Sequence, residues 1–325
     1  MSKKKKILLI TLSSVLAAIL LTLTIYYFGA FYPKFNKVAI KEFSIPGLET
    51  TFVPQGLTYS ETTNQFCVPG YMGDKSASRI YVVNKSDYQV EKYFTVKFDN
   101  ELSTAHFGGI ATYNNTVWVT GEDSVLRFNI SQIQNVNNGE SVEALDEFKT
   151  GNACSFLTIK NNQLVVGEFY RDGSHESPSN HHITTNNGTN KSLTVVYDIN
   201  ENNKYGLVDD VAEYGISMPN KVQGMTFNKD GKIVLSTSYA IADSKVYIYE
   251  NILDGTPSAT TTFNNKTLNV YVLEESNLIS TLTCPAMSEE VELVDGKVFI
   301  SFESACKKYK FVNRTRTKHV YSLDI

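Results

Sequence analysis

A unit of three or four short strands occurs five times along this chain, and this repeat constrains the fold more than any other feature. Each unit has a first apolar strand, a short polar turn, a second apolar strand and a third strand with alternating polarity. A unit of this kind cannot bury both faces alone, so neighbouring units must pack on one another. The repeat predicts an all-β propeller. The first strands begin near Gln55, Gly108, Ser155, Gln223 and Glu289.

The number of strands predicts how the ring closes. A fourth strand follows in four of the units, at 90–96, 142–148, 211–216 and 278–283, while the fifth unit has only three strands. The segment 38–45 precedes the first unit and supplies the missing strand. Pairing this N-terminal strand with the last unit leaves no open sheet edge. We therefore expect a five-bladed β-propeller over residues 38–325, closed by its N-terminal strand.

The N-terminus predicts a membrane anchor. Four lysines at 3–6 precede an uncharged segment that is longer than the roughly 20 apolar residues needed to cross a bilayer. We expect a basic cytoplasmic tail at 1–6, a transmembrane signal-anchor helix at 7–32 and a linker at 33–37. The lysines retain the N-terminus in the cytoplasm, so the propeller is extracellular on a single-pass membrane protein. A cleaved signal peptide is the alternative, and it also exports the propeller.

Charge and cysteine content limit the partners. The formal charge of −4 includes six lysines before residue 38, so the exported part carries −10. An acidic surface repels phosphate backbones, and we expect no nucleic-acid partner. The four cysteines lack the spacing of a metal site. Cys284 with Cys306 is the candidate disulfide, and buried free thiols are the alternative for Cys67 and Cys154.

The topology gathers polar side chains around one mouth of the central channel. Strands one and two of each unit are antiparallel, so the start of strand one and the end of strand two lie on the same side. Long loops at 71–78, 169–192 and 303–318 fall on this side, where ligand sites are expected. The predicted ligand-binding residues are Gln55, Tyr71, His106, Glu168, Tyr170, Gln223, Tyr239, Glu289 and Glu303.

Some of these residues are also catalytic or metal-binding candidates. Carboxylates in a shared space can act as acid and base, or they can bind a divalent cation in the channel. Salt bridges to nearby lysines or arginines are the alternative role for the same glutamates. No G-x-S-x-G or H-E-x-x-H motif is present. The catalytic candidates are Glu168, Glu289, Glu303 and His106, and the loop histidines that could bind a metal are His175, His181 and His182.

Two resemblances concern the exported part. Pro54-Gln-Gly-Leu-Thr-Tyr and Pro69-Gly-Tyr-Met-Gly-Asp-Lys-Ser resemble exported β-propellers of Gram-positive bacteria, a family without an established activity. The first unit also resembles five-bladed glutaminyl-peptide cyclotransferases, which open with a Gln-Gly-Leu strand and follow it with a turn containing Gly-Lys-Ser. That resemblance implies the same fold. The acidic residue of that family on the second strand is absent here, where Val68 and Pro69 stand.

Three hypotheses for function follow. The first is a membrane-anchored extracellular propeller that binds a peptide, glycan or protein partner at the channel mouth. The second is an exported enzyme, either a glutaminyl cyclotransferase-like acyl transferase or a metal-assisted hydrolase or lactonase. The third is a purely structural surface protein. The first is the leading hypothesis, because the mouth is polar and rich in loops while the sequence has no recognisable nucleophile motif.

Overall fold

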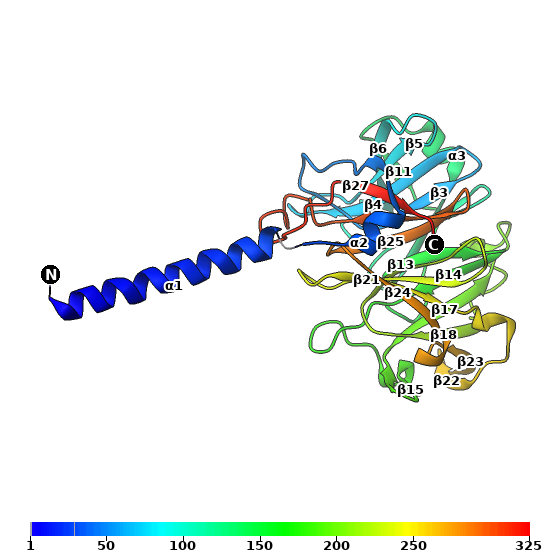
Figure 1. Ribbon diagram of the computed structural model, residues 1–325. Coiled ribbons are helices and arrows are strands. Elements are labelled where there is room, and N and C mark those ends of the chain that lie inside the picture. Colours follow the sequence, from blue (N-terminus) through cyan, green and yellow to red (C-terminus); the bar gives the residue numbers. More distant parts are fainter. Residues whose placement is uncertain (1, 29) are drawn as a thin grey trace.

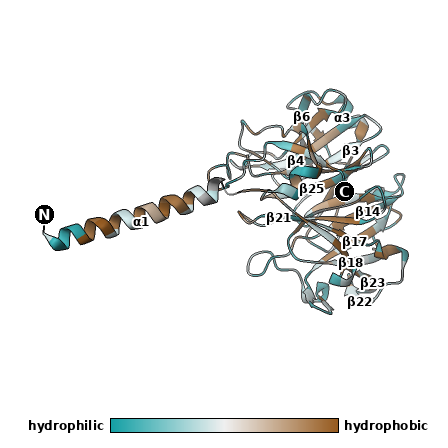
Figure 2. Cartoon of the chain, in the orientation of Figure 1, coloured by the Kyte–Doolittle hydropathy of each residue, from teal (hydrophilic) through white to brown (hydrophobic). Residues whose placement is uncertain are grey.

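A long apolar helix precedes the body of strands. The structure, a computed structural model, describes residues 2–28 and 30–325, and helix α1 (Lys3–Phe28) projects away from the body (Figure 1). Residues Lys3–Thr24 are long and apolar enough to cross a membrane, a property that a signal sequence shares. Figure 2 shows the hydrophilic N-terminal end of this helix and its apolar middle.

The helix ends earlier than the predicted span of 7–32. A second short helix, α2 (Pro33–Val38), follows α1 and buries Phe35. Proline at the first position of α2 disfavours helical backbone in the residue before it, so one continuous helix through residue 32 is not formed. The predicted linker at 33–37 is therefore helical.

The described strands form five sheets of four or more strands, in an all-β propeller (Figure 1). Three sheets have four strands each, and two are extended to seven and six strands. Each of these five sheets contains four strands that pair antiparallel, one beside the next. In the first sheet the innermost of these strands is divided in two. The expected propeller class is thus confirmed.

The strands of the five sheets have the following bounds. The first sheet contains β2 (Phe52–Pro54), β3 (Thr58–Ser60), β4 (Gln65–Met72), β5 (Arg79–Asn84), β6 (Val90–Phe98) and β7 (Glu101–Leu102). The second contains β8 (Ile110–Tyr113), β9 (Thr116–Thr120), β10 (Val125–Asn129) and β12 (Asp146–Phe148). The third contains β13 (Phe156–Lys160), β14 (Gln163–Gly167), β17 (Ser192–Asp198) and β18 (Tyr214–Met218). The fourth contains β19 (Val222–Phe227), β20 (Ile233–Thr237), β21 (Ser244–Tyr249) and β24 (Leu278–Cys284).

The fifth sheet joins the two ends of the propeller. It contains β25 (Ser288–Val294), β26 (Lys297–Phe302), β27 (His319–Leu323) and, outermost, β1 (Ala39–Ser44). Ala39 lies opposite Leu323 and Ser44 opposite His319. This is the closure that the strand count predicts.

Two features of the sheets differ from the expectation. The predicted fourth strand at 142–148 is divided, because β11 (Ser141–Glu143) pairs in parallel with β6 of the first sheet and only β12 completes the second. A hairpin of β22 (Ala259–Phe263) and β23 (Lys266–Val272) extends the third sheet, with β23 parallel to β18. Short helices and turns connect these strands, among them α3 (Ile130–Asn135) and the hairpin of β15 (Ile183–Thr185) and β16 (Gly188–Asn190).

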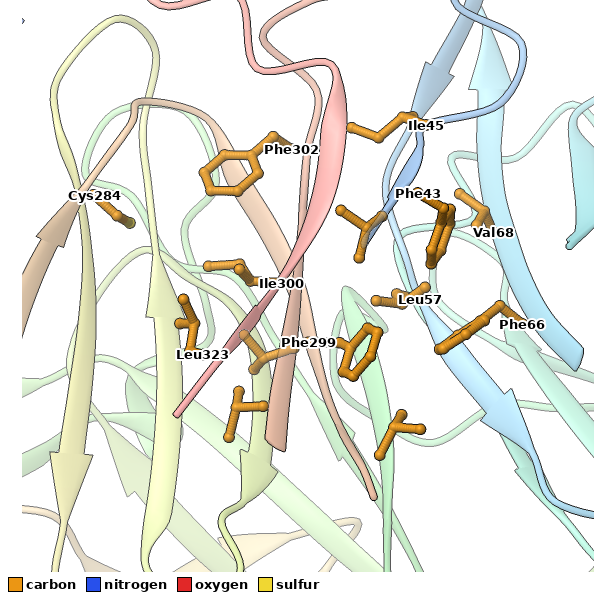
Figure 3. Packing of buried hydrophobic residues seen from close by; sticks show 14 of the residues in the cluster. Phe43, Ile45, Leu57, Phe66, Val68, Cys284, Phe299, Ile300, Phe302 and Leu323 are labelled. Atoms are coloured by element: carbon orange, nitrogen blue, oxygen red, sulfur yellow. The ribbon is translucent and has the colours of Figure 1, made fainter. Parts of the chain in front are cut away.

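The closing strand takes part in a hydrophobic core. Phe43 of β1 lies beside Phe66 of β4, with ring centroids 5.0 Å apart, and Phe66 lies beside Phe299 of β26 at 5.3 Å (Figure 3). All three side chains are buried. The core therefore spans the contact between the first and fifth sheets.

The four cysteines correct the disulfide prediction. All of them are buried free thiols. Cys284 ends β24 in the fourth sheet, whereas Cys306 follows β26 in the fifth. The prediction paired them because it assigned both to one blade, and this assignment was wrong.

Candidate functional site

Five of the predicted mouth residues form one contiguous group, which we call the mouth cluster. Gln55 lies between β2 and β3, Tyr71 on β4, His106 ahead of β8, Glu289 on β25 and Glu303 directly after β26. They come from three neighbouring sheets and meet at the end where strand one begins and strand two ends. Glu289 and Gln55 are buried, Tyr71 and Glu303 are half-buried, and His106 keeps part of its surface open to solvent although its ring is packed against neighbours.

Gln55 links the other members. Its Nε2 donates to Glu303 Oε2 at 2.9 Å and to its neighbouring carbonyl, Pro54 O, at 2.8 Å. Its Oε1 lies 2.6 Å from His106 Nε2. An amide oxygen only accepts, so His106 Nε2 carries a proton and donates it to Gln55. Gln55 therefore fixes both the position of the carboxylate and the tautomer of the histidine.

Glu289 and Glu303 are two acids whose protonation is linked. Burial raises the pKa of Glu289 well above its ordinary value, and the charge of Glu303 raises it further. Burial also raises the pKa of Glu303 to about 7, against the opposing effects of the Gln55 hydrogen bond and the Lys308 charge. Two adjacent carboxyls cannot both ionise without strong repulsion. At neutral pH Glu289 is therefore the protonated partner and Glu303 the one that ionises.

His106 is neutral beside this pair. Its ring packs against Tyr71, with centroids 4.3 Å apart. Loss of water around the ring, followed by the charges of Lys308 and His175, lowers the pKa of His106 to about 4. Because Nε2 donates to Gln55, Nδ1 is the nitrogen of the neutral ring that can accept a hydrogen bond.

The loop after Glu303 covers one side of the cluster. Lys308 Nζ donates to Tyr71 Oη at 2.7 Å, and Tyr309 Oη lies 3.3 Å from the same oxygen. Burial and the contact with the Tyr309 hydroxyl raise the pKa of Tyr71. Lys308 and Tyr309 were not predicted as ligand-binding residues, although Lys308 was one of the lysines expected as a salt-bridge partner of the mouth glutamates.

Two further acids lie deeper along β25. Glu290 Oε1 accepts from the backbone N–H groups of Met225 at 3.3 Å and Val291 at 3.2 Å. Glu292 Oε1 accepts from Thr58 Oγ1 at 3.2 Å, and burial raises the pKa of Glu292 to about 8. The signal for these residues was the run Glu289-Glu290-Val291-Glu292 on an inner strand. The carboxylate of Glu290 accepts a hydrogen bond from the fourth sheet, and that of Glu292 accepts one from the first sheet. We therefore assign both residues a structural role.

Glu168 lies outside the mouth cluster. It is 1% exposed, and both of its carboxylate oxygens lie 3.0 Å from His181 Nδ1. The backbone N–H of Leu193 also donates to it at 2.8 Å. Glu168 thus holds the 169–192 loop onto the third sheet. Its partner is His181, whereas the alternative role predicted for this glutamate was a salt bridge to a lysine or arginine.

The other predicted ligand residues have local partners. Tyr170 Oη donates to Asp172 at 2.7 Å and accepts from Lys191 at 3.1 Å. Tyr239 lies under the Arg171 guanidinium, and Gln223 donates to Ser238 Oγ at 3.4 Å. None of these contacts joins Tyr170, Tyr239 or Gln223 to the mouth cluster.

The predicted loop histidines do not converge. His181 is buried on Glu168, while His175 contacts Ser174 Oγ at 2.9 Å and His182 contacts Ser177 Oγ at 3.1 Å. Across residues 2–28 and 30–325, no group of three or more histidine, cysteine, aspartate or glutamate side chains is placed to hold a metal ion. The geometry of the described residues therefore does not support a divalent cation in the channel.

Comparisons with known proteins found similar solved structures but no relative by sequence. No protein-family model and no curated protein matches the chain. Similar solved structures include Kuenenia stuttgartiensis hydrazine synthase, at 12% identity and a TM-score of 0.40 over 78% of this chain and 56% of that one. Myxococcus xanthus glutaminyl cyclase has 9% identity and a TM-score of 0.47 over 88% and 95%. The WD40 β-propeller domain of Doa1 has 8% and 0.39 over 88% and 96%.

These likenesses do not assign an activity. The chain spans just over half the length of the hydrazine synthase chain. At such low identities a shared fold is compatible with unrelated functions, because function resides in the site rather than in the fold.

Proposed function

We propose that this protein is a membrane-anchored extracellular propeller whose mouth cluster binds a ligand that carries an amine, such as a peptide end or an amino sugar. The observation that carries the proposal is the Glu289–Glu303 pair, held in place by Gln55. The pair presents one ionised carboxylate at the mouth. Placement of the propeller outside the cell rests on the four lysines at the start of α1.

The cluster contains more acceptors than donors. Glu303 is ionisable and half-buried, and Nδ1 of the neutral His106 ring is an acceptor. Among the residues that the structure describes, the buried Glu289 Oε1 has no hydrogen-bond partner. Lys308 is the nearby cation, and its ammonium group already donates to Tyr71. A ligand that fits must therefore bring N–H donors, and an ammonium group also complements the charge of Glu303.

The rings of Tyr71 and His106 form an aromatic surface on one side of the site. Tyr71 packs against His106, and a peptide or sugar ring can lie against such surfaces. We expect binding of a peptide amine to strengthen as the pH rises toward about 7, because Glu303 ionises in this range while an α-amino group, with a pKa of roughly 7.7–8.0, is still mostly charged.

Matched probes test this function. The full-length chain in nanodiscs is titrated with a short peptide that has a free N-terminal amine and with its N-acetylated form, and with chitosan and chitin oligosaccharides. We expect the free amines to bind and Glu303→Gln to weaken binding by about tenfold or more, the size of a lost charged hydrogen bond. Glu122→Gln, at an exposed residue of the same end, is the matched control. Equal binding of free and acetylated probes would reject the proposal.

A general acid–base enzyme is the second candidate. The observation that favours it is the Glu303 pKa of about 7, which suits a group that both takes and gives protons near neutral pH. Val68 and Pro69 are buried in β4 and supply no carboxylate there, so a cyclotransferase would have to use Glu303. Release of ammonia from a peptide with N-terminal glutamine, lost in Glu303→Gln and retained in Glu122→Gln, would support this candidate. Absence of release would reject it for that substrate.

A further inference from the structure

Exposed apolar side chains gather where α1 meets the propeller. Phe31 is 76% exposed, Phe311 71%, Val312 54% and Ile241 45%. They belong to three segments: the residues after α1, the turn between β20 and β21, and the 303–318 loop. We call these four residues the juxtamembrane surface. Side chains of this size are seldom left in water together without a function.

Polar contacts join the three segments. Tyr32 Oη donates to Asp243 Oδ1 at 2.7 Å, and Arg314 forms an ion pair with the same carboxylate. Burial and the Asp243 contact raise the pKa of Tyr32 to about 12, so its hydroxyl stays a donor. Within α1 itself, Tyr26 Oη donates to Val312 O at 3.3 Å. The juxtamembrane surface is therefore fixed at the end of the helix.

The length of α1 places this surface at the level of the headgroups. From the last of the four lysines, a hydrocarbon core is crossed in roughly 20 residues, which ends the crossing near Tyr26. Tyr26 contacts Val312, and Phe31 follows α1 by three residues. Both positions thus lie where the apolar core gives way to headgroups, the depth that aromatic side chains favour.

The charge of the adjoining loop suits an anionic surface. Between Glu303 and β27 the chain carries six basic residues and no acidic one. This contrasts with the exported part as a whole, which carries −10. Lys307, Arg316 and Lys318 are exposed. Basic residues beside apolar anchors are the composition of segments that bind anionic bilayers.

We infer that the 303–318 loop and the juxtamembrane surface dock on the headgroups of anionic phospholipids in the membrane that α1 crosses. Phe31, Phe311, Val312 and Ile241 enter the interface, and the loop lysines and arginines contact lipid phosphates. Because Glu303 begins this loop, docking turns the mouth of the propeller toward the bilayer. The inference rests on α1 spanning the membrane and does not depend on the ligand of the mouth cluster.

Site-directed spin labelling of the full-length chain tests the docking. A nitroxide at Phe311→Cys is compared with one at Asp230→Cys, an exposed residue in the turn between β19 and β20 at the opposite end of the propeller. The native cysteines are buried and do not compete for the label in the folded protein. Each variant is reconstituted in nanodiscs of phosphatidylcholine alone and of phosphatidylcholine with phosphatidylglycerol.

We expect collisions of the label at 311 with a water-soluble nickel chelate to fall several-fold relative to the label at 230, and collisions with oxygen to rise. Protection of the label at 311 should require phosphatidylglycerol. It should weaken in a triple variant that combines Lys307→Gln, Arg316→Gln and Lys318→Gln. The control Lys266→Gln, at an exposed residue outside the loop, should leave the protection unchanged. Equal nickel accessibility at the two positions would overturn the docking. Equal protection without phosphatidylglycerol would overturn the role of anionic lipid.

Discussion

Gln55 Nε2 lies 2.9 Å from Glu303 Oε2, across the boundary between the first and fifth sheets. The first sheet contains the start of the propeller body, and the fifth contains its end together with β1. The contact therefore lies at the closure of the ring. The same amide binds His106 ahead of β8 at 2.6 Å, so one side chain at the closure connects residues of three sheets.

The acid pair should make the stability of the protein depend on pH. The folded-state pKa of Glu303 is about 7, above the ordinary 4.5, so between these values the folded state holds a proton that the unfolded state has released. The free energy of unfolding therefore falls as the pH rises from 5 to 8. We expect Glu303→Gln to reduce this fall by on the order of 1 kcal/mol, because Glu303 is partly screened by water.

Chemical denaturation of the full-length chain in detergent, at pH 5 and pH 8, measures this difference. His106 has a lowered pKa and acts in the opposite sense, with stability lost as the pH falls from 6.5 toward 4. The His106 contribution is present in both the parent protein and Glu303→Gln, so it cancels to first order when their pH dependences are compared. Glu122→Gln should behave as the parent protein. The assignment fails if Glu303→Gln retains the full dependence on pH.

Close contact between inner strands should make Gly109 intolerant of a side chain. A Cβ at this position would lie 2.4 Å from the backbone nitrogen of Leu157 and 2.5 Å from Phe156 Cα. These are backbone atoms, which cannot rotate away. We expect Gly109→Ala to lower the free energy of unfolding by about 1–3 kcal/mol or more.

Urea denaturation of Gly109→Ala and of Gly255→Ala tests this packing. A Cβ on Gly255 comes no closer than 3.4 Å to another atom, and its φ of −94° suits alanine. The control should therefore change stability by no more than about 0.5 kcal/mol. Equal stability of the two variants would contradict the close approach of β8 and β13.

The sequence predicts the sheets better than their extensions. Alternating polarity and polar turns identify the antiparallel strands, and the strand count identifies β1 as the closing strand. The parallel pairing of β11 with β6 has no such signal, because neither strand is adjacent to the other in the chain. The hairpin of β22 and β23 had a signal in its turn, Asn264-Asn265, where both residues have positive φ.

The same limits apply to the candidate site. Antiparallel topology alone brings Gln55, Tyr71 and Glu303 to one end of the propeller. It cannot distinguish them from Glu168, which ends a second strand in the same way but is bound by His181. That contact arises from the course of the 169–192 loop, and loop conformation depends on local hydrogen bonds that strand patterns do not encode.

The closing strand should contribute to stability through Phe43. This side chain is 2% exposed and lies against the rings of Phe66 and Tyr88. Phe43→Ala leaves a cavity between the first and fifth sheets, and we expect it to cost about 3–5 kcal/mol. Ile40→Ala, on the same strand but 49% exposed, is the matched control. Thermal unfolding of both variants in detergent measures this difference. Similar melting temperatures would show that packing of Phe43 from β1 does not stabilise the core.

Thiol reactivity should distinguish buried cysteines from a disulfide. All four thiols are buried, and desolvation raises the pKa of Cys67 and Cys154 to about 12 and that of Cys306 to about 11. The reactive thiolate is therefore scarce at neutral pH. We expect a maleimide to label none of the four in the native protein and all four after denaturation without reductant, as counted by intact mass. If a disulfide joined Cys284 and Cys306, only two cysteines would be labelled after denaturation until a reductant was added.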